Sequence, residues 1–284
     1  MATLIDMRRR IRSVKGTQQI TRAMKMVAAA RLRRSQERIF NARPYARQLM
    51  NLLQSLAART EWRGHPLLAT RPVEKILVVL VTADRGLCGA FNTNLIRAAE
   101  TYRAEHAGQE ISFVLVGRKG YEHYRQRSVK IAGKHVNIFF RLEFSAAETI
   151  AREIIESYSG CTVDAVDVIY NEFKSVLSQR VRVERYLPIP PLEPTAEETL
   201  VDYIYEQPPH RLLQTLLPHY VEIEVYRALL ESQAAELAAK MTAMDTATNN
   251  AADMIETLTL TMNRIRQAAI TREIIEVVSG AAAL

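Results

Sequence analysis

The feature of this sequence that most constrains its fold is a stretch of 61 residues, from His219 to Ser279, that contains neither glycine nor proline. Glycine and proline are the residues that most often end a helix, so this stretch can form one continuous α-helix. At about 1.5 Å per residue, such a helix would reach roughly 90 Å. An unsupported helix of that length is not stable in water, so we expect a partner helix along it.

The apolar residues of this stretch recur at alternating steps of four and three, with Thr248 as the one polar member. The series is Leu237, Met241, Met244, Thr248, Ala251, Ile255, Leu258, Met262, Ile265 and Ala269. Sustained heptads of this kind predict a left-handed coiled coil with a slim seam. A core helix of a bundle would show a similar pattern, but it would need several partner helices of comparable length.

The positive charge of the chain, +7 in total, is concentrated at the N-terminal end. Residues 1–47 carry thirteen lysines and arginines against two acids, a net charge of +11. Residues 208–284 carry six basic against nine acidic residues, a net charge of −3. The two ends are therefore opposite in charge, and the basic surface belongs to the N-terminal segment.

Three interpretations fit this basic segment: an amphipathic helix, a nucleic-acid-binding arm and a mitochondrial presequence. Its apolar residues recur at helical spacing, and the first aromatic residue is Phe40, so the base-stacking aromatics of a nucleic-acid binder are missing. Both observations favour a packed helix, and the apolar residues in question are Ile11, Val14, Ile20, Met24, Val27, Ala28 and Leu32.

We expect this first helix to run from about Leu4 to about Ala58, with interruptions or kinks at Gly16 and Pro44. If both terminal helices project from the same side of the middle segment, they run antiparallel. The C-terminal helix then extends past its shorter partner, and its tip must be covered by another molecule.

The middle of the chain alternates short apolar runs with helical patterns, which predicts an α/β domain. PIPPLEPT (188–195) follows it as a proline-rich connector. The predicted domains are an N-terminal helix (1–60), the α/β domain (70–187), the connector (188–207) and a C-terminal helix (208–284). Strands are expected at 75–83, 111–117, 164–173 and 180–187, with a further one at 136–142, and helices at 93–106, 121–126 and 146–158.

No constellation in the sequence predicts catalysis. The phosphate-binding pattern GxxxxGK[ST] is absent, and GRKG (117–120) lacks the glycine spacing of a dinucleotide site. Cys88, in DRGLCG (84–89), has no histidine nearby that could activate it. The six histidines show no metal-ligand spacing, and no apolar stretch approaches the ~20 residues of a membrane span. We therefore expect no cofactor and no metal, with a small-molecule enzyme as the third-ranked alternative.

Both ends of the chain resemble those of a known family, the gamma subunit of the F-type rotary ATP synthase. RIRSVKGTQQITRAMKMVAAARL (10–32) is similar to the family's N-terminal segment, and NRIRQAAITREIIEVVSGAAAL (263–284) to its C-terminal signature. TADRGLCGAFN (82–92) resembles the start of the family's α/β domain. Residues 188–208 lack the cysteine-bearing insertion of the chloroplast form. No presequence precedes the first helix, which favours the bacterial type, with a mature mitochondrial chain as the alternative.

The resemblance implies a fold and a function. The fold is an antiparallel two-helix coiled coil formed by the terminal helices, with a central Rossmann-like α/β domain. The function is that of a non-catalytic rotor shaft, which couples ion flow through the membrane c-ring to ATP synthesis in the beta subunits. The implied partners are the alpha and beta subunits, the epsilon subunit and the c-ring, at the cytoplasmic face of the bacterial plasma membrane. A basic coiled-coil protein that binds nucleic acid is the alternative.

The resemblance also implies three groups of site residues. Contacts with the beta subunits are assigned to Met24, Lys25, Met26, Arg266, Gln267 and Thr271. A basic shaft surface is assigned to Arg8, Arg9, Arg31, Arg33 and Arg34. An apolar tip held in the bearing of the ring is assigned to Ile274, Val277, Val278, Ala281 and Leu284.

Overall fold

The computed structural model describes residues 4–57, 65–190 and 207–282. Their contacts divide the chain into two compact units. Unit 1 combines the two ends of the chain, residues 1–29 and 240–284, and unit 2 comprises residues 30–239.

Two long helices contribute to both units. Helix α1 spans Leu4–Ala57 and continues through Gly16 and Pro44, so the expected interruptions are wrong. Helix α5 spans Pro209–Ala282, beginning ten residues before His219, with Pro218 inside it. A proline removes only one backbone hydrogen bond of a helix, and side-chain packing on both sides of Pro218 holds the helix, since Leu217 and Val221 are buried.

Unit 1 is the predicted antiparallel coiled coil. Two side-chain bonds join its helices: Thr21 Oγ1 lies 2.8 Å from Thr248 Oγ1, and Lys25 Nζ donates to Asp245 Oδ1 at 2.6 Å. Residue numbers rise along α1 while those of their partners fall along α5, so the two helices are antiparallel.

The seam of α1 differs from the predicted one. Burial selects positions separated by four and three residues, and polar side chains occupy several of them: Met7, Ile11, Val14, Gln18, Thr21, Lys25 and Ala28. The side chains of Ile20 and Val27, both expected in the seam, are 62% and 53% exposed. Three successive positions of this seam, Gln18, Thr21 and Lys25, are polar, so the apolar residues of α1 alone do not mark it. On α5 the predicted series holds, since all ten members are buried or half-buried.

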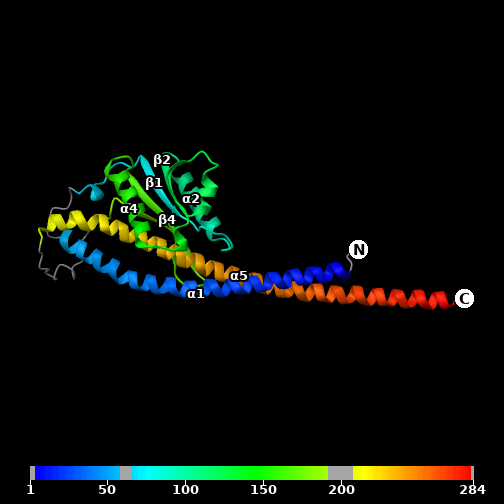
Figure 1. Cartoon of the computed structure of the whole chain (residues 1–284). Coiled ribbons are helices and arrows are strands. Elements are labelled where there is room, and N and C mark those ends of the chain that lie inside the picture. The colour runs from blue at the N-terminus through cyan, green and yellow to red at the C-terminus, as the bar shows by residue number, and fades with distance from the viewer. Residues whose placement is uncertain (1–3, 58–64, 191–206, 283–284) are drawn as a thin grey trace. The chain divides into compact units, whose positions relative to one another are not determined.

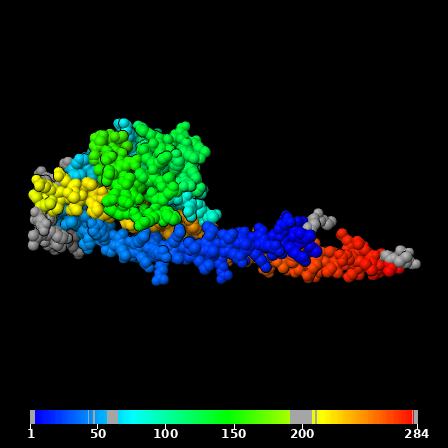
Figure 2. All heavy atoms as spheres, in the orientation of Figure 1, coloured from blue at the N-terminus to red at the C-terminus, as the bar shows by residue number. Residues whose placement is uncertain are grey.

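Helix α5 extends past α1 in unit 1, as expected. Thr21 lies opposite Thr248, so 17 residues toward the start of α1 is Leu4, and 17 residues further along α5 is Ile265. Figure 2 shows the end of α5 (red) continuing beyond the described start of α1 (blue). Residues 270–279 are all exposed in the chain on its own.

Unit 2 is built around a five-stranded sheet of order β3-β2-β1-β4-β5. The strands β1 to β4 are parallel and β5 pairs antiparallel with β4. Their bounds are Lys75–Val81 (β1), Glu110–Val116 (β2), Lys130–His135 (β3), Ala165–Phe173 (β4) and Gln179–Leu187 (β5). Six of the seven residues of β1 are buried, as in a strand covered on both faces.

Three shorter helices cover this sheet, with α2 and α4 on opposite faces (Figure 1), as right-handed crossovers require. They are α2 (Phe91–Glu105), α3 (Arg118–Tyr124) and α4 (Phe144–Ser159). Short 3-10 turns lie at η1 (Pro66–Leu68) and η2 (Ile138–Phe140). The strand expected at 136–142 is therefore wrong: β3 ends at His135, and Asn137, with φ of 64°, turns the chain into η2.

Within unit 2, α5 passes through the most buried environment of the chain. Between Ala228 and Ala238 every residue except Gln233 is buried. The Ser35 hydroxyl of α1 lies 3.4 Å from Oε1 of Gln233, whose amide donates to the Phe139 carbonyl of η2. This segment of α5 therefore packs against α1 on one side and the α/β layers on the other. The proline-rich connector is described only to Pro190; the rest lies outside the described residues.

Candidate functional site

The residues assigned to beta-subunit contact form two separate groups in unit 1. Met24, Lys25 and Met26 lie on α1, where Met24 is half-buried and Met26 is 61% exposed. The second group, Arg266, Gln267 and Thr271, lies exposed on α5. Lys25 pairs with Asp245, and Arg266 is 21 residues further along α5, which corresponds to about 30 Å of helix. The structure does not bring the two groups together. Each group would contact a partner at a different position along the coiled coil.

The basic residues of α1 are displayed to solvent. Arg8, Arg9, Arg31, Arg33 and Arg34 are all exposed. Among the described residues, the only ion pair of this set joins Arg33 Nε to Glu37 at 3.6 Å, with side chains 85% and 64% exposed. Such an exposed pair contributes little, so these five cations keep their charge available for an external partner.

The end of α5 exposes an apolar surface in unit 1. The exposed fractions of Ile274, Val277 and Val278 are 58%, 71% and 61%. Ala281 is also exposed, whereas Leu284 lies outside the described residues. Ile270 and Ile275 belong to the same surface, at 48% and 59% exposed. The resemblance did not assign these two residues to the tip, although their apolar side chains stand in the same segment of the sequence. Contiguous exposed apolar side chains mark a surface that a partner covers.

The two glycine-containing turns of the α/β unit bind each other rather than a ligand. Asp84, in the turn after β1, accepts three backbone N–H groups: Arg118 at 3.0 Å, Asn137 at 2.6 Å and Phe139 at 3.1 Å. Its carboxylate therefore occupies the N-terminus of α3, where a phosphate would sit in a nucleotide-binding turn. The GRKG segment is thus filled by an anion of the chain itself.

Cys88 has the surroundings of a structural residue. Its thiol is buried and accepts a hydrogen bond from the Asn92 side-chain amide at 3.2 Å. The amide oxygen of Asn92 in turn accepts the N–H of Ala83. This network ties the turn after β1 to the first turn of α2, and it supplies no base to activate the sulfur.

Doubly wound sheets bind ligands in a crevice at the point where the strand order reverses, and the same position can be located in this sheet. It lies at the carboxyl ends of β1 and β4, where the strand order reverses. Glu231 of α5, 2% exposed, enters at the end of β4 and accepts the N–H of Phe173 at 3.0 Å. A carboxylate of α5 therefore lies at the edge of the sheet where doubly wound folds bind ligands.

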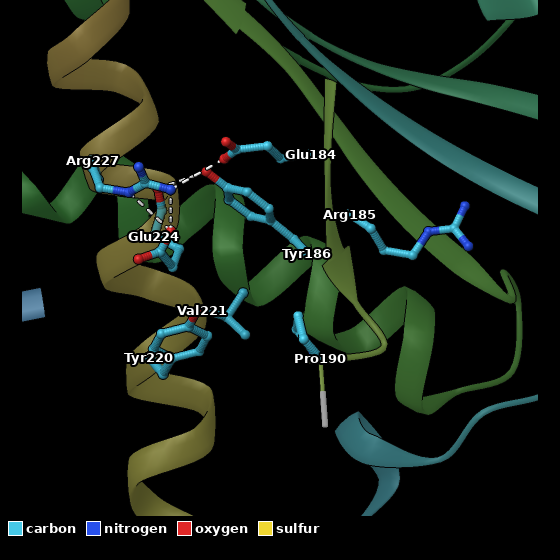
Figure 3. Close-up of a pocket in the computed structure, with 8 residues that line it drawn as sticks. All are labelled: Glu184, Arg185, Tyr186, Pro190, Tyr220, Val221, Glu224 and Arg227. Carbon is cyan, nitrogen blue, oxygen red and sulfur yellow. Dashed lines mark hydrogen bonds and ion pairs between the residues drawn. The ribbon is translucent and has the colours of Figure 1, made fainter. Parts of the chain in front are cut away.

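A pocket of about 400 Å³ lies between β5 and α5 in unit 2 (Figure 3). Arg227 lines the pocket and donates to Glu224 at 2.6 Å and to Glu184 at 3.2 Å. The Tyr186 hydroxyl donates to the Glu224 carbonyl at 3.1 Å, and burial raises the pKa of this phenol. The charges of the pocket are therefore balanced by its own residues. We interpret the pocket as a packing defect beside an ion-pair network that attaches α5 to β5.

None of the helices among the described residues combines the length and hydropathy that a membrane crossing requires. In the same part of the chain, no three His, Cys, Asp or Glu residues are grouped as metal ligands would be.

Comparison with known proteins agrees with this architecture over the whole chain. The family model described as ATP synthase matches residues 3–284. The ATP synthase gamma chain of Solibacter usitatus is 54% identical over 287 residues, covering 100% of this chain and 99% of the relative. That of Pelotomaculum thermopropionicum is 46% identical over 284 residues and covers both chains completely.

Solved structures give the same result. A chain from the central stalk and c-ring of the Tetrahymena thermophila mitochondrial ATP synthase matches with a TM-score of 0.61 and 26% identity, covering 80% of this chain and 99% of that one. A chain from the Euglena gracilis mitochondrial ATP synthase matches in fold, with a TM-score of 0.67 and 19% identity over 99% of this chain and 94% of that one. The sequence, the fold and these likenesses lead to one conclusion: the chain belongs to the ATP synthase gamma-chain family and is a subunit of that enzyme complex.

Proposed function

We propose that this chain is the central rotor shaft of a bacterial ATP synthase. The observation that carries the proposal is the coiled coil of unit 1, which ends in an uncovered apolar stretch of α5 on a chain of the gamma family. Rotation of such a shaft presents different side chains to each catalytic site in turn. Each site then passes between states of different nucleotide affinity, which is coupling by differential contact.

The chain itself is proposed to be non-catalytic. Two observations support this: Asp84 fills the N-terminus of α3, and the Glu231 carboxylate lies at the carboxyl end of β4. The catalytic chemistry would then reside in the alpha and beta subunits. The chain acts on them by contact and holds no nucleotide.

The proposed partners are the alpha and beta subunits, the epsilon subunit and the c-ring, at the cytoplasmic face of the bacterial plasma membrane. The Tetrahymena relative comes from a central stalk with its c-ring, which supports this set. Family membership favours the rotor over the alternative of a nucleic-acid-binding protein.

The proposed contacts follow the exposed groups of the two long helices, α1 and α5. Met24, Lys25, Met26, Arg266, Gln267 and Thr271 would meet the beta subunits. The five exposed arginines would face acidic surfaces of the ring, and the apolar tip would enter its bearing. The exposed Met26, Arg266 and Gln267 support this assignment because no described residue covers them.

Co-expression with the alpha and beta subunits tests the proposal. We expect a stable complex whose ATP turnover depends on this chain, and the absence of a complex would contradict the proposal. Alanine at Met24, Arg266 or Gln267 should lower coupled turnover without preventing assembly. Gln19→Ala is the matched control for Gln267→Ala, because Gln19 is exposed on α1 without a hydrogen bond to any described residue.

A further inference from the structure

Lys25 differs from the other basic residues at the N-terminal end of α1. Its ammonium donates to Asp245 at 2.6 Å, with the two side chains 40% and 47% exposed. The remaining cations of α1 in unit 1 have no carboxylate partner among the residues that the structure describes, namely Arg8, Arg9, Arg10, Arg12, Lys15 and Arg22. The ion pair neutralises Lys25 alone, so Lys25 does not add to the positive charge of this surface as its neighbours do.

A second polar contact lies one helical turn from this ion pair. The hydroxyls of Thr21 and Thr248 lie 2.8 Å apart, and Thr21 is 8% exposed. The Thr248 hydroxyl donates to the Met244 carbonyl at 2.7 Å, so Thr21 supplies the proton of the contact between the two hydroxyls. Buried polar residues in a coiled coil fix how the helices pair, at some cost in stability. Two cross-helix polar contacts within one turn therefore fix the rotation of α1 about its own axis at this level.

The orientation of Lys25 determines what its neighbours present. Successive residues of an α-helix point about 100° apart. With Lys25 directed at α5, Met24 is half-buried at the edge of the seam and Met26 is turned to solvent, 61% exposed. A change in the Lys25–Asp245 contact would thus move both methionines together.

We propose that Lys25 and Asp245 form a cross-helix positioning pair, assisted by Thr21 and Thr248, and that the counter-ion of Lys25 is Asp245 rather than a carboxylate of a partner subunit. The inference rests on the proposed rotor function. It withdraws Lys25 from the proposed contacts with the beta subunits and makes Asp245 a positioning residue for the contacts of Met24 and Met26. An exposed ion pair contributes little to stability, so its main effect is expected on coupling.

Charge exchange separates the two roles of Lys25. The complex is assembled with Lys25→Asp, with Asp245→Lys and with both changes, and ATP hydrolysis and ion pumping are measured on each. We expect each single change to lower pumping relative to hydrolysis by about threefold or more, since it places like charges together. The double change restores the pair in the opposite direction and should return most of the coupling. Arg22→Asp with Asp245→Lys is the matched control, and it should show no rescue because Arg22 does not face Asp245.

The outcomes are distinguishable from failure of the rotor function itself. If Asp245→Lys is harmless and the double variant remains as impaired as Lys25→Asp, then Lys25 acts directly on a partner and the inference is overturned. If Met24→Ala uncouples the complex while none of the pair variants does, the pair has no positioning role. If the unaltered chain forms no complex, the rotor proposal fails instead. Should a charge reversal prevent folding, Asp245→Asn removes the charge at nearly constant shape and should still reduce coupling.

Discussion

At the scale of single residues, the α/β unit depends on contacts between its turns that allow no alternative. Gly117 has a φ of +90°, and a Cβ built there would lie 2.0 Å from the backbone oxygen of Thr82. Thr82 is itself buried, donating its hydroxyl to the Val116 carbonyl and accepting the N–H of Gly120. The GRKG segment, which its glycines make resemble a phosphate turn, is therefore explained by close packing of β1 against the start of α3.

Gly117→Ala is expected to destabilise the chain by about 2–4 kcal/mol, because the methyl group meets a backbone atom and the backbone angle is unfavourable for alanine. Denaturant unfolding followed by circular dichroism measures this. Gly108→Ala is the control, since no atom lies within 4 Å of its added Cβ, and its effect should stay within about 0.5 kcal/mol. Equal stabilities for the two variants would contradict the packing argument.

At the scale of elements, the helices and strands whose burial follows a regular spacing could be predicted from the sequence. Those whose position depends on single polar contacts could not. The heptads of α5 and the apolar runs of β1, β2 and β4 were predicted correctly because burial follows their spacing. The seam of α1 was not, because Thr21 and Lys25 enter it through bonds to α5 that one helix alone cannot reveal. The strand expected at 136–142 does not form for a similar reason. The N–H groups of Asn137 and Phe139 donate to the Asp84 carboxylate, which holds this apolar segment as a loop.

The slim seam of unit 1 predicts a sharp difference between two alanines of α1. Ala28 is 2% exposed, whereas Ala23 is exposed on the same helix. Ala28→Leu should destabilise the coiled coil by about 1–3 kcal/mol through overpacking, and Ala23→Leu should be nearly neutral. Hydrogen exchange of the amides of residues 7–28 measures the local effect. Tolerance of leucine at both positions would show that the seam is not close-packed.

The acid stability of unit 2 depends on Asp164, which joins the starts of β4 and β1. Its carboxylate accepts the N–H groups of Lys75 at 2.9 Å and Glu74 at 3.1 Å, with Arg71 nearby. The pKa of Asp164 is lowered below its ordinary value of 3.8, mainly by the hydrogen bond from the N–H of Lys75. The N–H of Glu74 and the charge of Arg71 lower it further. Protonation therefore favours the unfolded chain, and this contribution is complete above pH 3.8 and is lost as the pH falls below it.

Asp164→Asn should remove that part of the pH dependence. We expect the stability of the variant to fall less steeply than that of the unaltered chain below pH 3.8, while the variant is less stable at neutral pH. Urea unfolding at a series of pH values provides the comparison, and because other carboxylates titrate in both proteins, the difference between the curves isolates Asp164. Parallel curves would show that the carboxylate is not stabilised by these bonds.

At the scale of the whole molecule, the proposed function rests on the charged and apolar surfaces that the chain exposes. Within unit 2, Glu231 accepts the N–H of Phe173 at the carboxyl end of β4, and Arg227 pairs with two glutamates. The exposed features of the chain are five arginines of α1 and an apolar end of α5, and we propose that other molecules cover them. The charge of residues 1–47 predicted the basic surface, and the resemblance to the family predicted the apolar tip. The sequence could not predict that Lys25 is held by Asp245, because the pairing depends on the register of two segments 220 residues apart.

The proposed rotor function is tested by observing whether this chain rotates within an assembled complex. Cys161 is exposed and Cys88 is buried, so a thiol-reactive bead attaches to Cys161 of the unaltered chain in an immobilised complex with the alpha and beta subunits. On addition of ATP, the account predicts that the bead turns continuously in one direction, at a rate that rises with the rate of hydrolysis. A complex that hydrolyses ATP through this chain while the bead stays at a fixed angle would contradict it.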